Sequence, residues 1–250
     1  MKIYAYTPLH YGKEYLYHSI KSYEALVDKI LIFYTDKPSF GTRLNLKCPD
    51  SQDELRAIAE SASNKIEWHH VNANTEGQHR DRHKQYLSEC DLMFTSDADE
   101  VWWSDKLDQA FKVAYDDKKH GSFGVTGKVD LWCSFDWQMV DWFAPVRILK
   151  NGVGQINIDC PYLHFGYAQS MATIDYKMRI HGHIGDVNSV HGNVDKYLDK
   201  VRKWIPYTKD YYHPASKNVW IQAQRYDKTL MPDLMKDHPY YNLTKILWNT

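Results

Sequence analysis

Three carboxylates stand within four consecutive residues of the chain, at Asp97, Asp99 and Glu100, directly after the apolar segment 91–96. Carboxylates this close repel one another unless a cation or hydrogen-bond donors offset their charge. Carboxylate oxygens are hard ligands, which Mg²⁺ and Mn²⁺ prefer and which phosphate oxygens and water usually complete. A solvated acidic turn is the other interpretation of such a pattern. The apolar segment directly upstream favours a site that holds a divalent cation and a phosphate group.

The segments before these acids alternate between strand and helix patterns. Ser51 and Glu54 form a capping box, so a helix is expected to begin there and to run to about Ala62. Strands joined by helices form right-handed crossovers and a mostly parallel sheet with helices on both faces. The acids then lie at the carboxyl edge of the sheet, where open α/β sheets bind their ligands. Strands are expected at 2–7, 29–35, 65–71 and 91–96, and helices at 11–27, 51–62 and 77–89.

The sequence changes character after Glu100. A helix is expected first, then several strands around an Asn151-Gly152 turn, and then further helices. Because no repeat or linker interrupts the chain, we expect one α/β domain over 1–250, with an N-terminal half 1–101 and a mixed C-terminal half 102–250. The expected elements of the second half are 104–117, 146–149, 155–158, 168–180 and 194–204.

The composition of the 250 residues is that of an ordinary globular protein, with 25% charged and 43% apolar residues and a formal net charge of −1. Its four cysteines form no C-x-x-C pair, which fits a reducing compartment and argues against a structural zinc or a disulfide scaffold. No apolar run approaches the roughly 18 residues that cross a bilayer, and we see no secretory signal. We therefore expect a cytoplasmic protein without a transmembrane segment.

Aromatic residues make up 14% of the chain, and several tryptophans gather in its middle. Aromatic rings bury a large area and also stack on bases and on the C–H faces of sugars. Trp132, Trp137 and Trp142 are therefore candidates for an acceptor platform, and the alternative is that they fill the core. Residues 164–250 hold 12 Lys and Arg against eight Asp and Glu, which permits an anionic acceptor but makes no dense basic stripe.

The run Asp97-Ala98-Asp99-Glu100 and the run His164-Phe165-Gly166 resemble the D-x-D-E and H-x-G elements of family 2-like glycosyltransferases, which have the GT-A fold. The resemblance extends over most of the chain and is strongest at 1–101 and 161–183. It implies a Rossmann-like, mostly parallel sheet flanked by helices, with a mixed C-terminal part. It also implies that the first half binds a nucleotide sugar and the second half an acceptor.

The resemblance also implies which individual residues bind the donor. The opening strand and its exit loop hold the nucleotide in this family, which points to Tyr6, Thr7 and Pro8. An acid after the second strand contacts the nucleoside, and Asp36 matches it. The helix before the D-x-D strand carries an Arg-Asn pair, which leaves Arg80 or Arg82 as the match because the asparagine is missing here.

The resemblance also implies a metal site for Mn²⁺ or Mg²⁺. The first acid of the motif faces the donor ribose or sugar and the second binds the metal, so Asp97 and Asp99 take these roles, with Asp97 close enough to share the ion. An imidazole at His164 would complete a mixed carboxylate and imidazole shell. Lys177 and His183 follow this block, and their positive charges would offset the charge of the diphosphate.

The implied reaction moves a hexosyl or pentosyl group from a nucleoside diphosphate sugar, most commonly a UDP-sugar, to an acceptor hydroxyl. Inversion is expected, although the sequence alone does not decide between inversion and retention. An inverting enzyme needs a carboxylate base near the acceptor. Asp136 and Asp141 are our candidates for it. The acceptor is a glycan, a lipid-linked sugar or, as a minority hypothesis, a hydroxymethylated pyrimidine in phage DNA, which would have to be exposed by base flipping.

Two other functions stay open. A metal-dependent phosphohydrolase or phosphotransferase would use Asp97, Asp99, His181 and His183, but the haloacid-type enzymes place their D-x-D after the first strand. A catalytically inactive module that binds nucleotides or carbohydrates is the second alternative. A dinucleotide oxidoreductase is not supported, because Gly152-Val153-Gly154 follows a turn and opens no helix.

Overall fold

The computed structural model of the chain describes residues 1–38, 45–180 and 184–246. These residues fall into two compact units, each built from several segments of the sequence. Unit 1 comprises 1–37, 50–128 and 142–164, and unit 2 comprises 38–49, 129–141 and 165–250. Within the described ranges, every helix is too short or too polar to span a bilayer.

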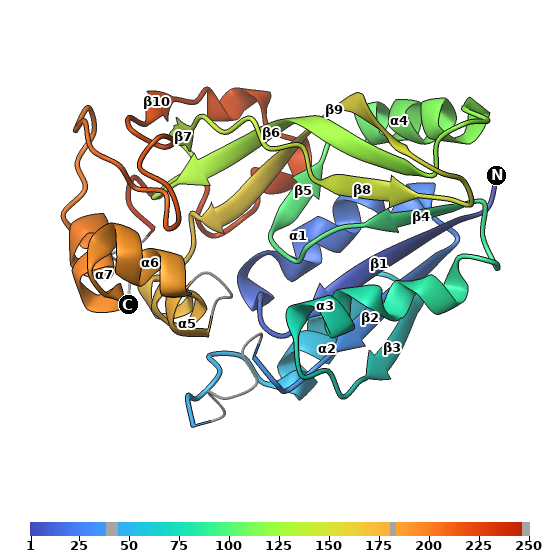
Figure 1. Cartoon of the computed structure of the whole chain (residues 1–250), viewed down its shortest axis with the longest axis horizontal. Helices are drawn as coiled ribbons and strands as arrows, with labels where there is room; N and C mark the ends of the chain where they lie inside the picture. The colour runs from blue at the N-terminus through green and yellow to red at the C-terminus, as the bar shows by residue number, and fades with distance from the viewer. Residues whose placement is uncertain (39–44, 181–183, 247–250) are drawn as a thin grey trace. The chain divides into compact units, whose positions relative to one another are not determined.

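Unit 1 is built on parallel strands that pair as their spacing predicts (Figure 1). The central strand β1 pairs with β2 on one side and with β4 on the other, and β2 pairs in turn with β3. Beyond β4 the sheet continues in antiparallel fashion through β8 to β6. The strands are β1 (Ile3–Leu9), β2 (Lys29–Tyr34), β3 (Ile66–His70), β4 (Leu92–Thr95), β6 (Ser122–Trp132) and β8 (Val146–Leu149).

Helices cover both faces of this sheet, so the α/β prediction is confirmed. Ile3, Ala5 and Leu9 of β1 pack into the core beneath α1 (Lys13–Tyr23), α2 (Gln52–Ala62) and α4 (Ser104–Asp116). Tyr4 and Tyr6 point to the opposite face, because successive side chains of a strand alternate. There they meet the segment of α3 (Glu76–Arg80), whose following 3₁₀ turn is η2 (Asp81–Tyr86).

Two helix predictions have different outcomes. The capping box is confirmed, since Ser51 Oγ accepts a hydrogen bond from the backbone N–H of Glu54 at 3.2 Å and α2 begins at Gln52. The continuous helix over 77–89 is wrong, because the α-helix ends at Arg80. The His83 side chain donates through Nδ1 to the carbonyl oxygen of Arg80 at 2.6 Å. A side chain that takes up a backbone acceptor in this way competes with the helical ladder.

Two further strands complete unit 1 beyond the acidic motif. Strand β5 (Glu100–Trp102) begins within the motif itself and pairs antiparallel with β9 (Gln155–Tyr167). In this register Glu100 lies opposite His164. The Asn151-Gly152 turn therefore leads from β8, which pairs with β4 and β6, into a long strand that pairs with β5 and β6.

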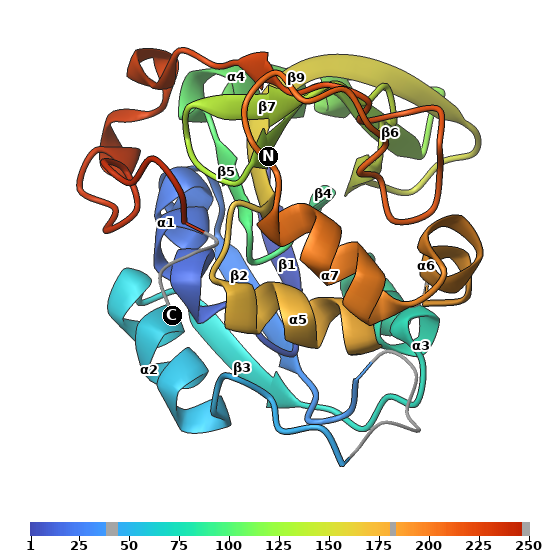
Figure 2. The same ribbon diagram turned by 90° about the vertical axis from the view of Figure 1, so that its left-hand side faces the viewer.

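Unit 2 combines the end of β6 with β7 (Trp137–Met139), which pairs with β10 (Gln224–Arg225). Its helices α5 (Met171–Ile180), α6 (Ile184–His191) and α7 (Val194–Arg202) contact one another, as the yellow and orange ribbons of Figure 2 show. The core of this unit is rich in aromatic residues, including Trp132, Trp137, Trp204 and Trp220. Short 3₁₀ turns lie at Glu24–Leu26 in unit 1 and at Lys228–Leu230 and Asp233–Met235 in unit 2.

Candidate functional site

The acidic loop that follows β4 is fixed on three sides. The backbone N–H of Ser96 donates to the carbonyl oxygen of Tyr6 at 3.0 Å, which continues the pairing of β4 with β1. Trp102 Nε1 donates to Ser96 Oγ at 2.9 Å, and Ser19 Oγ of α1 donates to the carbonyl oxygen of Asp97 at 3.2 Å. These bonds fix the position of the loop at the carboxyl end of β4.

The start of α1 lies against the same loop because Gly12 has no side chain. A Cβ atom on Gly12 would lie 2.8 Å from Cβ of Ala98, and the φ angle of Gly12 is 133°, which residues other than glycine rarely adopt. The first backbone N–H groups of the helix are already bonded. Gly12 and Lys13 both donate to Asp50 Oδ2, at 2.7 and 3.0 Å. The helix N-terminus at which a dinucleotide-binding fold holds pyrophosphate is therefore filled by a carboxylate of the chain.

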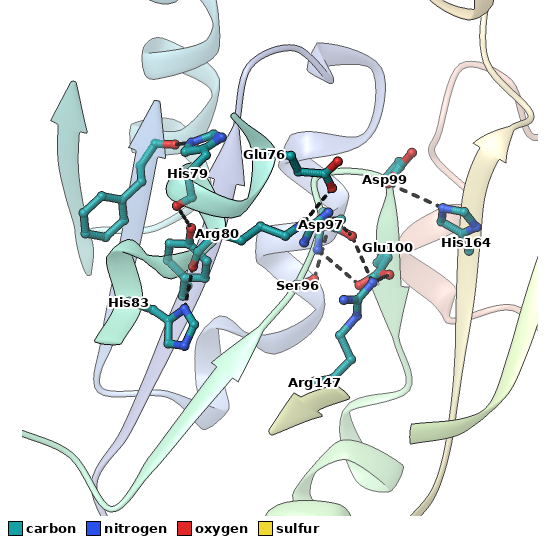
Figure 3. Close-up of polar contacts among 12 residues, drawn as sticks. Glu76, His79, Arg80, His83, Ser96, Asp97, Asp99, Glu100, Arg147 and His164 are labelled. Carbon is teal, nitrogen blue, oxygen red and sulfur yellow. Dashed lines mark hydrogen bonds and ion pairs between the residues drawn. The ribbon is translucent and has the colours of Figure 1, made fainter. Parts of the chain in front are cut away.

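Asp97 lies between two arginines (Figure 3). Arg80 donates from Nη1 to Oδ1 at 3.0 Å and from Nη2 to Oδ2 at 3.4 Å, and Arg147 donates from Nη2 to Oδ2 at 2.9 Å. Burial opposes ionisation of Asp97, but the guanidinium groups of Arg80 and Arg147 hold its pKa well below the usual value. Asp97 is thus a fixed negative charge whose two oxygens both accept hydrogen bonds.

Glu100 lies on the other side of Arg147, whose Nη2 also donates to the Glu100 carboxylate. The Glu100 side chain is almost fully buried, and its Oε2 accepts a hydrogen bond from the backbone N–H of Asp97 at 3.1 Å. Burial raises the pKa of Glu100 above its usual value, although Arg147 acts in the opposite direction. The surroundings of Asp97 thus lower its pKa and those of Glu100 raise its pKa, although the two carboxylates belong to one motif.

Hydrogen bonds of the neighbouring residue His79 fix the position of Arg80 beside the acidic motif. The Tyr6 hydroxyl donates to the carbonyl oxygen of His79 at 2.5 Å, and His79 Nε2 donates to the carbonyl oxygen of Phe33 at 2.5 Å. These bonds tie α3 to β1 and β2. Burial raises the pKa of Tyr6 and lowers the pKa of His79, so both side chains are neutral at neutral pH.

Asp99 directly precedes β5 and its Oδ1 lies 3.9 Å from Nε2 of His164 on the paired strand β9 (Figure 3). Neighbouring ligands about 2.1 Å from one octahedral ion lie about 3.0 Å apart, so the two side chains would have to move closer together to bind one divalent ion. Asp97 fits less well, since both of its oxygens are bonded to guanidinium groups. Among the described residues no group of three or more His, Cys, Asp or Glu side chains is arranged to hold a metal. Further ligands would have to come from phosphate or water.

A cavity of about 550 Å³ lies within unit 1 beside these residues. Its volume is in the range of pockets that hold nucleotide-sized molecules. The α3 segment borders it on one side and the strand β8 on another. Its lining includes Tyr6, Arg80, His83, Asp97, Arg147 and His164.

The predicted donor-binding residues are only partly gathered at this cavity. Tyr6 lines it, whereas Thr7 faces the opposite side of the sheet and bonds to the hydroxyl of buried Tyr23 at 3.3 Å. Pro8 is half-buried in β1, and Asp36 is exposed, with its carboxylate 3.9 Å from His70 Nε2. Of the two candidate arginines, Arg80 lines the cavity. Arg82 is exposed and donates to the carbonyl oxygen of Asn72 at 2.9 Å.

Four other predicted residues belong to unit 2 or to its undescribed part. Asp136 forms an ion pair with Lys228 at 3.3 Å, and Asp141 is half-buried. Lys177 Nζ donates to the carbonyl oxygen of Gly166 at 3.2 Å, which connects α5 to the end of β9. His183, like His181 of the alternative phosphohydrolase site, lies outside the described residues.

The three tryptophans of the predicted acceptor platform differ in exposure. Trp132 and Trp137 are 0% and 5% exposed and belong to the core of unit 2, where Trp132 packs against Tyr167 and Trp204. For these two residues the core interpretation fits the structure, because no ring face is open to a ligand. Trp142 of unit 1 is 81% exposed, and its neighbour Phe143 is 67% exposed and lines the cavity.

Sequence reasoning missed Arg147, which is the central cation of the site. The signal was present, since Arg147 interrupts the apolar run Val146-Arg147-Ile148-Leu149, and a charged side chain inside a strand is buried only where it is paired. Lys128 and His83 also line the cavity and were not singled out. They stand in segments without any pattern that marks a binding residue.

No protein-family model matches the sequence, and no curated protein matches it. Solved structures with a similar fold include a mannosyltransferase from Pyrobaculum calidifontis in complex with GDP-Man and Mn²⁺, with a TM-score of 0.46 and 8% identity over 82% of this chain and 65% of that chain. Glucosyl-3-phosphoglycerate synthase from Mycobacterium tuberculosis has a TM-score of 0.37 and 12% identity over 50% of this chain and 43% of its own. This chain thus spans less than half of the synthase.

A third similar structure is a UDP-glucose pyrophosphorylase in complex with UDP-glucose, with a TM-score of 0.33 and 11% identity over 91% of this chain and 93% of that chain. The three proteins carry out different reactions according to their names. At these TM-scores and identities the likeness carries no conclusion about the reaction, which has to be argued from the site itself.

Proposed function

We propose that this chain is a glycosyltransferase that moves a sugar from a nucleoside diphosphate sugar to an acceptor hydroxyl. The observation that carries the proposal is the nucleotide-sized cavity at the carboxyl end of β4, lined by Asp97 between Arg80 and Arg147. Asp99 Oδ1 lies 3.9 Å from His164 Nε2, and we propose these two side chains as ligands of a divalent metal. A diphosphate needs cationic groups and a sugar needs fixed hydrogen-bond acceptors, and both kinds of group converge here.

In the proposed reaction the acceptor oxygen bonds to the anomeric carbon of the donor sugar. The bond from that carbon to the diphosphate oxygen breaks, and the nucleoside diphosphate leaves with the electron pair. Asp97, held ionised by Arg80 and Arg147, accepts hydrogen bonds from donor hydroxyls and fixes the sugar. Asp136 and Asp141 are the proposed bases for the acceptor proton in an inverting transfer, and Asp136 is paired with Lys228.

A divalent ion held by Asp99 and His164, either Mn²⁺ or Mg²⁺, would supply positive charge to the leaving diphosphate. Lys177 and His183 are proposed to add positive charge, and Tyr6, Thr7, Pro8, Asp36 and Arg80 to bind the donor. We propose a UDP-sugar as the donor. The acceptor proposed is a glycan or a lipid-linked sugar, with a modified pyrimidine in DNA as the minority choice, and the proposed compartment is the cytoplasm.

The experiment that tests the function is incubation of the protein with a panel of UDP-, GDP-, CDP- and dTDP-sugars and Mn²⁺, with and without acceptors of each class. Release of nucleoside diphosphate, by transfer or by slow hydrolysis, is the expected result for one donor. Release of inorganic phosphate instead would identify a phosphohydrolase. Formation of nucleoside triphosphate from a nucleotide sugar and added pyrophosphate would identify a pyrophosphorylase. Nucleotide binding without any product would identify an inactive module.

A further inference from the structure

Arg147 is buried within the candidate site, and only one of its guanidinium nitrogens forms hydrogen bonds to the acidic motif. It is 9% exposed, and it extends from β8 toward the loop that follows β4. Both of its hydrogen bonds, to Asp97 and to Glu100, come from the single nitrogen Nη2. Its Nε atom is buried and has no hydrogen-bond partner among the described residues.

Arg80, the other arginine of the site, differs in this respect. Its Nε donates to Glu76 at 2.8 Å, and its Nη1 and Nη2 both donate to Asp97. Carboxylates of the chain therefore occupy every nitrogen of Arg80. Of the two guanidinium groups that line the cavity, Arg147 is the one with a buried nitrogen that has no hydrogen-bond partner among the described residues.

A buried N–H without an acceptor is unfavourable, and native proteins rarely retain one unless a ligand or water satisfies it. Arg147 is a permanent cation that lines the cavity, so the ligand that complements its guanidinium is an anion. Guanidinium groups bind phosphate oxygens through strong, charge-assisted hydrogen bonds. Asp97 and Glu100 both accept hydrogen bonds from Nη2 of Arg147. The rest of the guanidinium is therefore available for such a bond.

We propose that Arg147 is an anion-binding residue that donates from its guanidinium to an oxygen of a diphosphate group in the cavity of unit 1. This inference rests on the proposed function for the identity of the diphosphate as part of a nucleotide sugar. The anion site itself follows from the geometry of Arg147 and exists whether or not a sugar is transferred. Arg147 thereby joins the leaving group to Asp97 and Glu100 through one side chain.

The test measures binding of inorganic pyrophosphate to the full chain by titration calorimetry in the presence of EDTA, so that no metal contributes. Removing Arg147 alone would leave the buried Glu100 without its cationic partner and risk unfolding, whereas Asp97 keeps Arg80. The variant is therefore R147M combined with E100Q, compared with E100Q alone. Loss of a charge-assisted hydrogen bond predicts that pyrophosphate binds on the order of ten- to a hundredfold more weakly to the double variant. R147K in the native background keeps the charge and is expected to bind with intermediate affinity.

Arg56 supplies a matched control, because it is an exposed arginine on α2 whose Nε donates to Glu60 at 2.7 Å. R56M is expected to bind pyrophosphate as the wild-type protein does. Equal affinity of E100Q and the double variant would overturn the proposal, and so would a wild-type protein that does not bind pyrophosphate at millimolar concentration.

Turnover of nucleotide sugars is scored separately in the same proteins. Pyrophosphate binding that depends on Arg147, without any turnover, would support the anion site and count against the proposed function. Turnover of nucleotide sugars together with a pyrophosphate affinity that does not depend on Arg147 would support the proposed function and count against the anion site.

Discussion

Arg80 and Arg82 are two positions apart, yet they touch different parts of the molecule. Arg80 lines the cavity and is bonded to Asp97, whereas Arg82 is exposed and bonded to a backbone carbonyl in the loop after β3. The difference follows from the helical segment, where neighbouring side chains point in different directions. Only a structure separates these two candidates, because the missing asparagine left the register of the motif open.

This pair provides the first prediction. R80K is expected to weaken binding of UDP by up to about tenfold, because lysine keeps the positive charge at the cavity wall but loses the bidentate contact that fixes Asp97. R82K keeps the charge on an exposed residue and is expected to leave the affinity within about twofold. Calorimetric titration of both variants measures the contrast. An R80K variant that binds UDP as tightly as R82K would show that Arg80 acts through its charge alone and that its bidentate geometry has no part in binding.

Asp99 is the carboxylate of the motif that faces His164, and Asp97 is the one that faces the arginines. D99N is therefore expected to weaken binding of Mn²⁺ to the complex with UDP by about tenfold or more, as loss of a charged ligand from a hard cation implies. Electron paramagnetic resonance of free Mn²⁺ measures the affinity directly. D105N is a matched control, because Asp105 is an exposed acid at the start of α4. Unchanged Mn²⁺ affinity in D99N would remove Asp99 from the metal shell.

At the scale of elements, the site depends on the close approach of α1 to the acidic loop. G12A places a Cβ atom 2.8 Å from Cβ of Ala98 at a φ angle of 133°. Ala98 is short and cannot move aside, so the loop or the helix must shift. We expect a loss of about 2 kcal/mol in the free energy of unfolding, in the range known for strained backbone, together with weaker nucleotide binding. Urea unfolding measures the first effect.

Gly185 in α6 is the control for this substitution. Among the described residues, no atom lies within 4 Å of the Cβ position there, so G185A is expected to stabilise the protein by up to about 1 kcal/mol through its helix propensity. A stable G12A variant with native nucleotide affinity would show that the contact between α1 and the loop has no part in forming the site.

The strands and helices of unit 1 were largely readable from the sequence, because their patterns are local. The Ser51–Glu54 capping box and the apolar runs 29–35 and 91–96 depend on neighbours within a few residues. The end of α3 at Arg80 was not readable, since it depends on a bond from the His83 ring to one backbone carbonyl. Similarly, the motif Asp97–Glu100 was evident, whereas Arg147 comes to it from β8, 47 residues beyond Glu100.

At the scale of the whole molecule, the sequence was least informative about which segments form a unit. The predicted halves met at residue 101, but the strands β8 and β9 bring 142–164 into unit 1. Which distant strands pair depends on the whole sheet, and local sequence patterns give little information about it. The tryptophans illustrate the same limit, because Trp132 and Trp142 are alike in the sequence and are 0% and 81% exposed in the structure.

Several histidines of unit 1 are buried in neutral form, and this makes the stability of the unit dependent on pH. Burial lowers the pKa of His10, His79 and His83 below the usual value of 6.5. As the pH falls through 6.5, these histidines bind protons in the unfolded chain but stay neutral in the folded state. Unfolding therefore becomes more favourable. The contribution of each histidine changes by up to about 1.4 kcal/mol per pH unit. We expect the urea midpoint to fall steadily between pH 7.5 and pH 5.5.

Glu100 acts in the opposite direction, because its raised pKa lets the folded state bind a proton that the unfolded state binds only at lower pH. The midpoint of E100Q should therefore fall more steeply than that of the wild-type protein toward the acidic end of the range. H79Q should fall less steeply, since glutamine can donate to the Phe33 carbonyl without titrating. His70 is an exposed histidine, and H70Q is expected to retain the wild-type slope. A urea midpoint that is flat from pH 7.5 to 5.5 in all four proteins would mean that the buried imidazoles are protonated as readily in the fold as in water.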